Sequence, residues 1–259
     1  SHPCSAGDNV NITIDQAWLE AVMLAGVRMV AFLVIAPPFS YNAFPGRVKA
    51  MLAIGLALAV APQVSQGYSS LGTAEFITGL VLEFVVGAVL GFLVLLVFSA
   101  VQSAGQLIDL FGGFSLAQGF DPQSMVNGAQ FTRMFQITAL ALLFASDGYQ
   151  LIIMGLSRSF TALPLAGGID LADPAQAMIS GVSNMFIAAV QIAGPLLVVL
   201  FLADAGLGLL TRVAPALNAF ALGFPLKILL TLTLISVVFL ALPRVVSVLA
   251  QEIVRTLAW

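Results

Sequence analysis

Two charged side chains, Arg28 and Glu83, stand inside long apolar stretches of the sequence. A charge left at the centre of a bilayer costs about 2.5–3.5 kcal/mol on insertion scales, so such a residue is expected to have a partner or a function. Glu83 could act as a proton or ion relay. It could instead pair with a cation and fix the register of two helices, or lie on a segment outside the lipid. We favour these structural interpretations, because a relay would normally show several acids at membrane depth.

Enzymatic and metal chemistry has little support among the residue types. The single His2 and the single Cys4 both lie at the start of the chain, so neither a buried histidine base nor a multi-cysteine metal site is expected. Asp109 and Asp121 lie far apart on an expected loop, unlike a catalytic pair of acids. We therefore expect no enzyme, no catalytic, metal or cofactor-binding residues and no cofactor.

The composition is that of a membrane protein. Of the 259 residues, 60% are hydrophobic and only 8% are charged, whereas a soluble domain carries about 25% charged residues. The net charge is −3 and the nine Lys and Arg are scattered, so no nucleic-acid partner is expected. Lipid or other apolar protein must cover much of the surface.

Six apolar stretches approach the roughly 20 residues that cross a bilayer. Backbone polar groups in lipid must bond within the segment, and the stretches lack the alternation of a barrel strand, so we predict an all-α, polytopic protein. No linker separates two compositions, so residues 1–259 are expected to form one domain. The stretches lie near 19–36, 48–62, 76–104, 131–156, 183–210 and 224–250.

Proline and glycine mark the expected breaks between these helices. Pro37-Pro38 should end the first helix, and Pro45-Gly46 should precede the second, because the residue before a proline avoids helical geometry. Residues 157–182 are expected to form another break. Gly194-Pro195 lies within the fifth stretch, which could be one kinked helix or a hairpin of two. The count of six spans therefore stays open.

Small residues recur every four positions on several expected helices. Gly79, Gly87 and Gly91 share a face with Glu83, and a similar stripe contains Ala53 and Ala57. Small residues allow helix backbones to approach closely, and helix association in lipid depends on such contact. We therefore expect Glu83 to face another helix.

Short motifs of charged, glycine and proline residues follow one another along nearly the whole chain. They are Asp204, Leu207-Gly208, Arg212, Ala214-Pro215, Asn218-x-Phe220, Pro225-Leu226-Lys227, Gly105 to Asp109, Gly112-Gly113-Phe114, Phe120-Asp121-Pro122, Arg28, Pro37, Pro45 to Lys49, Asp147-Gly148, Ser159-Phe160 and Pro164. In their order along the chain they resemble the FliR family of bacterial export proteins. The stretch from Asp204 to Lys227 is similar to the family signature, apart from Ala216, where family members commonly have Gln.

The resemblance implies a structural, pore-forming subunit of a type III protein-export gate, most simply the flagellar one, in the bacterial inner membrane. It implies long Pro- and Gly-interrupted helical hairpins that assemble into a spiral with homologous subunits. The implied partners are FliP-type and FliQ-type gate subunits, an FlhB-type subunit, membrane lipid and the unfolded export substrates.

The loop after the third apolar stretch is a candidate pore plug. Glycine permits unusual backbone angles, and aromatic rings can close a pore by excluding water. The resemblance implies the same role, whereas the residues alone would also suit a re-entrant turn buried in protein. The predicted plug residues are Gly112, Gly113, Phe114, Leu116 and Phe120.

Three further charges, Asp204, Arg212 and Lys227, bracket the turn before the last apolar stretch. They could pair with one another or with a neighbouring subunit and so hold the assembly together. Alternatively, Arg212 and Lys227 could extend to lipid headgroups. We leave both interpretations open.

A secondary transporter is the main alternative function. It would use Glu83 and the helix broken near Pro195 as a site at the bilayer midplane. This alternative predicts an internal repeat and a functional monomer, and the hydropathy pattern gives no convincing repeat.

Overall fold

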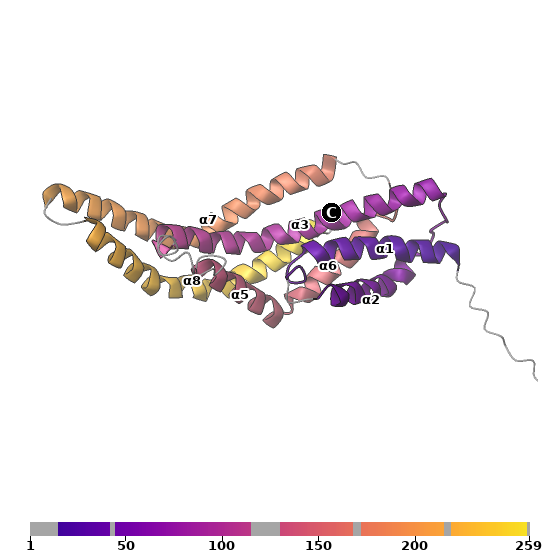
Figure 1. Cartoon of the computed structure of the whole chain (residues 1–259), viewed down its shortest axis with the longest axis horizontal. Coiled ribbons are helices and arrows are strands. Elements are labelled where there is room, and N and C mark those ends of the chain that lie inside the picture. Colours follow the sequence, from indigo (N-terminus) through magenta and orange to yellow (C-terminus); the bar gives the residue numbers. More distant parts are fainter. Residues whose placement is uncertain (1–14, 42–44, 115–129, 168–171, 215–218, 258–259) are drawn as a thin grey trace, which may run out of the picture.

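The computed structural model shows an elongated bundle of long helices (Figure 1). It describes residues 15–41, 45–114, 130–167, 172–214 and 219–257, and these contain no strand. The prediction of an all-α, polytopic protein is therefore confirmed. The helices are α1 (Gln16–Ile35), α2 (Gly46–Val64), α3 (Thr73–Phe111), α5 (Gln130–Ala145), α6 (Gly148–Ala162), α7 (Ala172–Val213) and α8 (Ala219–Leu257).

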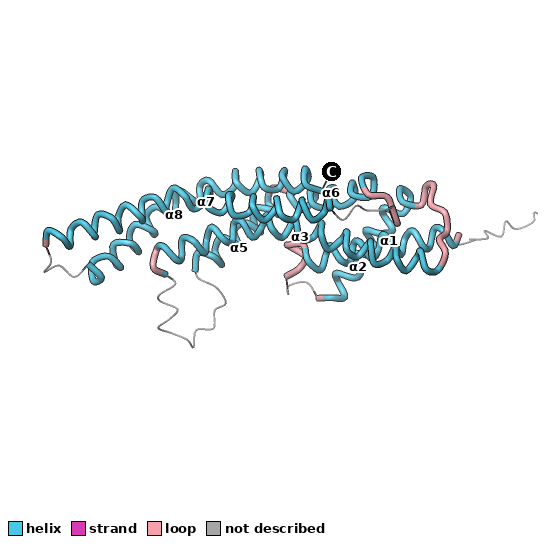
Figure 2. Tube along the Cα trace, turned by 90° about the horizontal axis from the view of Figure 1, so that it is seen from above, coloured by secondary structure: helices cyan, strands magenta, loops and turns pink. Residues whose placement is uncertain are grey.

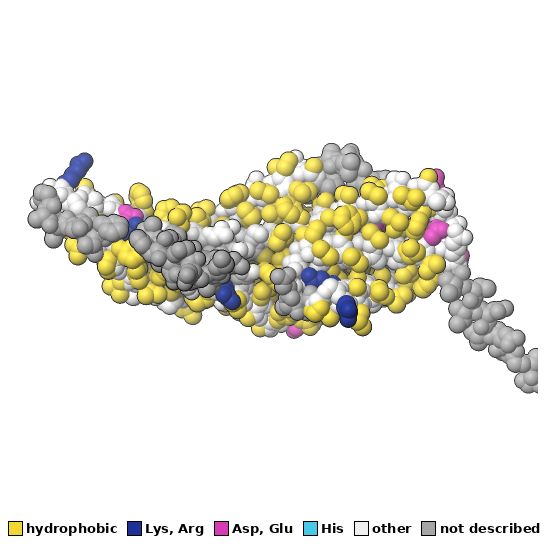
Figure 3. Space-filling view, in the orientation of Figure 1, with side chains coloured by type: hydrophobic (Ala, Val, Ile, Leu, Met, Phe, Trp, Pro, Cys, Tyr) yellow, Lys and Arg dark blue, Asp and Glu magenta, His cyan; other side chains and the backbone are white. Residues whose placement is uncertain are grey.

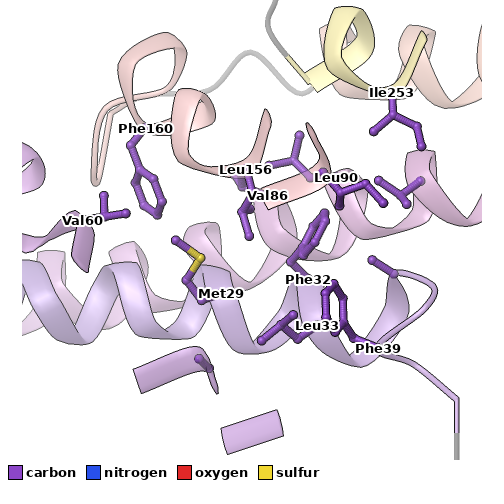
Figure 4. Packing of buried hydrophobic residues seen from close by; sticks show 14 of the residues in the cluster. Met29, Phe32, Leu33, Phe39, Val60, Val86, Leu90, Leu156, Phe160 and Ile253 are labelled. Carbon is purple, nitrogen blue, oxygen red and sulfur yellow. The ribbon is translucent and has the colours of Figure 1, made fainter. Parts of the chain in front are cut away.

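Helix α3, with 39 residues, is the axis of the molecule. It packs against α1, α5, α7 and α8. Two apolar clusters lie along it. One joins α1, α2, α3, α6 and the end of α8, with Phe32, Leu90 and Leu156 fully buried (Figure 4). The other joins α3, α5, α7 and α8 around Phe135 and Leu196. Each cluster thus fixes one half of α3 among neighbouring helices.

The helix boundaries near proline lie where the sequence predicts them. Helix α1 ends at Ile35, just before Pro37-Pro38, and α2 begins directly after Pro45. At the other end of α1, the side chain of Asp15 accepts a hydrogen bond from the backbone N–H of Ala17 at 3.2 Å. This N-cap satisfies one of the free amides of the first turn.

Two expected boundaries were wrong. Residues 131–156 do not form one straight span, because α5 and α6 meet at an angle of 77°. Asp147 between them has a φ of 54°, in the left-handed region that Asp tolerates and that stops a helix. The break expected over 157–182 is also shorter, since α7 begins at Ala172. Pro174 lies in its first turn, where a missing N–H costs no hydrogen bond.

Prolines inside the long helices leave those helices continuous. Pro195 lies within α7, which is one helix and not a hairpin, and Pro225 and Pro243 lie within α8. Five described helices are long and apolar enough to cross a membrane. A sixth crossing results if the bent pair α5–α6 counts as one span.

The ends of α7 and α8 extend past the end of α3 as a two-helix arm, at the left of Figure 1 and again in Figure 2. Large apolar side chains of α7 are exposed, including Phe201 at 67% and Leu209 at 64%. Apolar side chains also cover much of the face in Figure 3. Such a surface requires lipid or another protein.

Candidate functional site

Helices α1 and α3 approach closely at the glycines predicted to share a face with Glu83. A Cβ at Gly87 would overlap the carbonyl oxygen of Arg28 and lie 2.9 Å from the Cβ of Ala31. A Cβ at Gly91 would lie 3.1 Å from the carbonyl oxygen of Phe32. The absent side chains allow the two backbones to touch, and this contact places Arg28 beside Glu83.

The guanidinium of Arg28 is fully buried and all five of its N–H donors have acceptors. Its Nε and Nη2 donate to the two carboxylate oxygens of Glu83, at 2.5 and 3.1 Å. Its Nη1 donates to the carbonyl and hydroxyl oxygens of Ser159, at 3.2 and 3.3 Å. Its Nη2 also donates to the carbonyl oxygen of Leu163 at 2.9 Å. This planar fork is the geometry that arginine provides and lysine does not.

This Arg28–Glu83 node joins three helices and a connection. Glu83 also accepts from the backbone N–H of Ala166 at 3.2 Å, and the Phe160 ring lies 4.2 Å from the Arg28 Cζ. The network therefore connects α1, α3, α6 and the segment after α6. Removing one partner of such a buried pair would leave the other charge buried and uncompensated. These contacts are the ones expected if Glu83 pairs with a cation and fixes the register of two helices.

Tyr68, in the connection between α2 and α3, lies next to this node. Its hydroxyl oxygen is buried and has no hydrogen-bond partner among the described residues. Burial and the nearby carboxylates of Glu20 and Glu83 raise the pKa of the Tyr68 phenol above its ordinary value of 10.0. Glu20 itself accepts from the backbone N–H of Leu71 at 3.0 Å, which fixes the connection against α1.

A second buried acid, Asp109, joins the end of α3 to the start of α5, on either side of the segment that contains the predicted plug. Its carboxylate accepts from the backbone N–H groups of Phe131 and Thr132, at 3.1 and 2.8 Å, and from the Thr132 hydroxyl at 2.8 Å. These groups belong to the first turn of α5, where the helix dipole favours a negative charge. One turn earlier, a Cβ at Gly105 would lie 2.7 Å from the Cα of Thr132. Gly105 and Asp109 together hold the first turn of α5 against α3.

The described plug residues pack against α5 and α8. A Cβ at Gly112 would lie 2.8 Å from the Thr231 hydroxyl oxygen, and Gly113 has a φ of +84° that favours glycine. The rings of Phe114 and Phe131 meet edge to face, 4.9 Å apart. The other predicted plug residues, Leu116 and Phe120, lie outside the described residues.

The arm carries an ion pair of its own. The Nζ of Lys227 lies 2.7 Å from an Asp204 carboxylate oxygen, with 23% and 45% of the two side chains exposed. Arg212 lies in the last turn of α7 and is exposed. Within the described part of the chain no carboxylate pairs with it. The structure thus brings together two of the three charges predicted near this turn.

Sequence reasoning missed the contacts of Asp109, Ser159 and Tyr68. For Asp109 the available signal was the spacing of Gly105 and Asp109, which puts a small residue and an acid on one face immediately before a loop. Among the described residues no group of three His, Cys, Asp or Glu could hold a metal ion.

Comparison with known proteins identifies the family. Residues 19–253 match "Bacterial export proteins, family 1". The chain belongs to this family. The predicted resemblance to FliR proteins is thereby confirmed.

Individual members of the bacterial export family are similar to this chain over most of their length. The flagellar biosynthetic protein FliR of Escherichia coli (strain K12) is 30% identical over 251 residues, 96% of each chain. The FliR of Pectobacterium carotovorum subsp. carotovorum is 29% identical and covers 93% of this chain and 92% of its own. The Yop proteins translocation protein T of Yersinia pestis is 28% identical over 77% of this chain and 78% of its own.

Proposed function

We propose that the chain is a structural, pore-forming subunit of a type III protein-export gate in the bacterial inner membrane, without enzymatic activity. The observation that carries the proposal is the family match over residues 19–253, with relatives named for flagellar biosynthesis and for Yop translocation. The identity to flagellar proteins over nearly full length favours a flagellar apparatus. The substrates on this proposal are unfolded polypeptides.

The exposed apolar arm supports assembly with other membrane subunits. Long uncovered helices rich in leucine and phenylalanine, such as those around Phe201 and Leu209, bury their surface against similar helices. We assign FliP-type and FliQ-type gate subunits, and an FlhB-type subunit, as the partners. The helical hairpins would then form a spiral with homologous subunits.

The loop that begins at Gly112 is proposed as the plug of the closed pore. Its support is the aromatic and glycine content of the sequence and the attachment of its two ends through Asp109 to the first turn of α5. An anchored base would let the loop change conformation without moving α3 or α5. Deleting residues 112–120 should make the membrane permeable to ions or small solutes, and unchanged conductance would contradict the plug.

Copurification tests the subunit role directly. The tagged full chain should be coexpressed with the neighbouring genes of its own genome, extracted in mild detergent and weighed by native mass spectrometry. One discrete complex with several copies of FliP- and FliQ-type subunits is expected. A monodisperse monomer or homodimer that transports a small solute would instead identify a secondary transporter.

A further inference from the structure

A groove with polar side chains along its edge lies between α3, α7 and α8, away from the Arg28–Glu83 node and the loop base. Leu93, Leu96 and Val97 of α3 line it, and its volume is about 500 Å³. A hollow of about 310 Å³ continues it between α7 and α8, and Gln191 lines both. Along α7 the groove runs from Ala177 to Gln191, a length of about 21 Å at 1.5 Å per residue.

Two carboxamides, those of Asn184 and Gln191, stand open along this groove. They lie two turns apart on the same face of α7, and neither has a hydrogen-bond partner in the described part of the chain. The helix around them is one of the apolar helices long enough to cross a membrane. Lipid chains offer neither donors nor acceptors, whereas Asn and Gln side chains form hydrogen bonds between membrane helices.

A cation lies at the end of the same groove. Arg244 of α8 lines the smaller hollow together with Gln191 and is exposed. It forms no ion pair with any carboxylate of the described residues. Glu252, a carboxylate that lines the larger hollow, lies about two turns further along α8 and forms no ion pair with Arg244. A charge in apolar surroundings is normally paired, so Arg244 lacks a negative partner in the described part of the chain.

We propose that this groove is the docking site for an apolar helix of a second export-apparatus subunit, which places a carboxylate against Arg244 and hydrogen-bonding side chains against Asn184 and Gln191. The proposal rests on the proposed function and specifies one of its interfaces. A lipid headgroup could meet Arg244, but its acyl chains would leave both carboxamides unpaired. A helix lying along the groove can supply partners for Arg244, Asn184 and Gln191 at the same time.

Site-specific crosslinking of the full chain tests the docking site. A benzophenone amino acid is placed at Ala188, which lines both hollows, in cells that express the neighbouring export genes. On irradiation, the adduct should map to one apolar helix of a copurifying subunit, and that helix should contain an Asp or Glu. Adducts formed only with lipid would overturn the proposal.

Charge reversal at Arg244 supplies the second measurement. Arg244→Glu should lower the crosslink yield at least about tenfold, because like charges across an interface cost several kcal/mol. Reversing the partner's acid to Lys should restore the yield. Arg158→Glu is the matched control, since Arg158 is exposed on α6 and lies outside both hollows. Equal yields in the two variants would contradict the docking site.

The two proposals fail differently. If the chain copurifies with no export subunit, the proposed function is wrong. If it copurifies while Ala188 forms no adduct with any subunit, only the docking site is wrong. The Ala188 experiment uses the native charges, so a folding defect in Arg244→Glu does not affect it.

Discussion

Asp109, in the last turn of α3, accepts hydrogen bonds from both the backbone N–H and the hydroxyl of Thr132 at the start of α5. Asp109 is 1% exposed, and its carboxylate replaces the missing intrahelical acceptors of the α5 N-terminus. The two helices that flank the proposed plug are thus joined by one side chain.

Asp109→Asn should destabilise the protein by about 1–3 kcal/mol, because an amide in place of the carboxylate turns one acceptor into a donor that faces N–H groups. Thermal unfolding in detergent measures the loss. The matched control is Asp147→Asn, the same change at an exposed residue whose side chain caps nothing. Equal melting temperatures for the two variants would contradict the role of Asp109.

Arg28→Leu and Glu83→Leu should each cost about 3–5 kcal/mol, because each leaves a buried charge without its partner. The double variant should be more stable than the sum of the two losses predicts, since it leaves neither charge. A double-mutant cycle on unfolding in detergent gives this coupling energy. Additive losses would show that the pair contributes nothing beyond its separate residues.

Gly87→Ala should lower stability by about 1–3 kcal/mol, because the added methyl group overlaps the Arg28 carbonyl and separates α1 from α3. Gly55 of α2 provides the opposite case, as a Cβ there meets nothing within 4 Å. Gly55→Ala should stabilise the helix by roughly 1 kcal/mol. Both changes are measured by the same unfolding assay, and the prediction fails if they have the same sign.

Tyr68→Phe should not destabilise the protein at neutral pH, because it removes a buried hydroxyl that has no partner among the described residues. The folded state raises the pKa of this phenol above 10.0, so it holds the proton more tightly than the unfolded state. Wild-type stability should therefore fall as the pH rises above about 10. The variant should lose less stability over that range when unfolding is followed at pH 9 and pH 11.

Asp204→Lys should abolish copurification with the FliP-type subunit, since it places two cations together on the arm where the ion pair with Lys227 stood. The exchange Asp204→Lys with Lys227→Asp should restore the complex by re-forming the pair. Pull-down yields of the single and double variants give the comparison. Normal copurification of the single variant would favour headgroup contact by Lys227 instead.

The features predictable from sequence were local ones. Proline restricts its neighbours directly, so the boundary before Pro37-Pro38 and the start of α2 after Pro45 follow from single residues. The turn at Asp147 was missed because the surrounding run is apolar and contains no proline. Helical spacing alone predicts that Gly87 and Glu83 face another helix, but it does not show which helix.

Contacts across long chain separations could not be predicted in this way. Asp109 meets Thr132, 23 residues further along the chain, and Arg28 meets Ser159 and Leu163 from distant parts of the chain. The hydrophobic periodicity of one segment does not show which other segment packs against it. The hydrogen-bonding capacity of a side chain shows only that a partner must exist.

The length of α3 affects the lifetime of a copy of this protein that has not assembled with other subunits. Its 39 residues extend about 58 Å at 1.5 Å per residue, nearly twice the roughly 30 Å of a hydrocarbon core. Much of its apolar surface, with the neighbouring helices, must then lie in water or headgroups until other subunits cover it. A surplus copy is therefore expected to be short-lived, and its abundance should follow the supply of its partners.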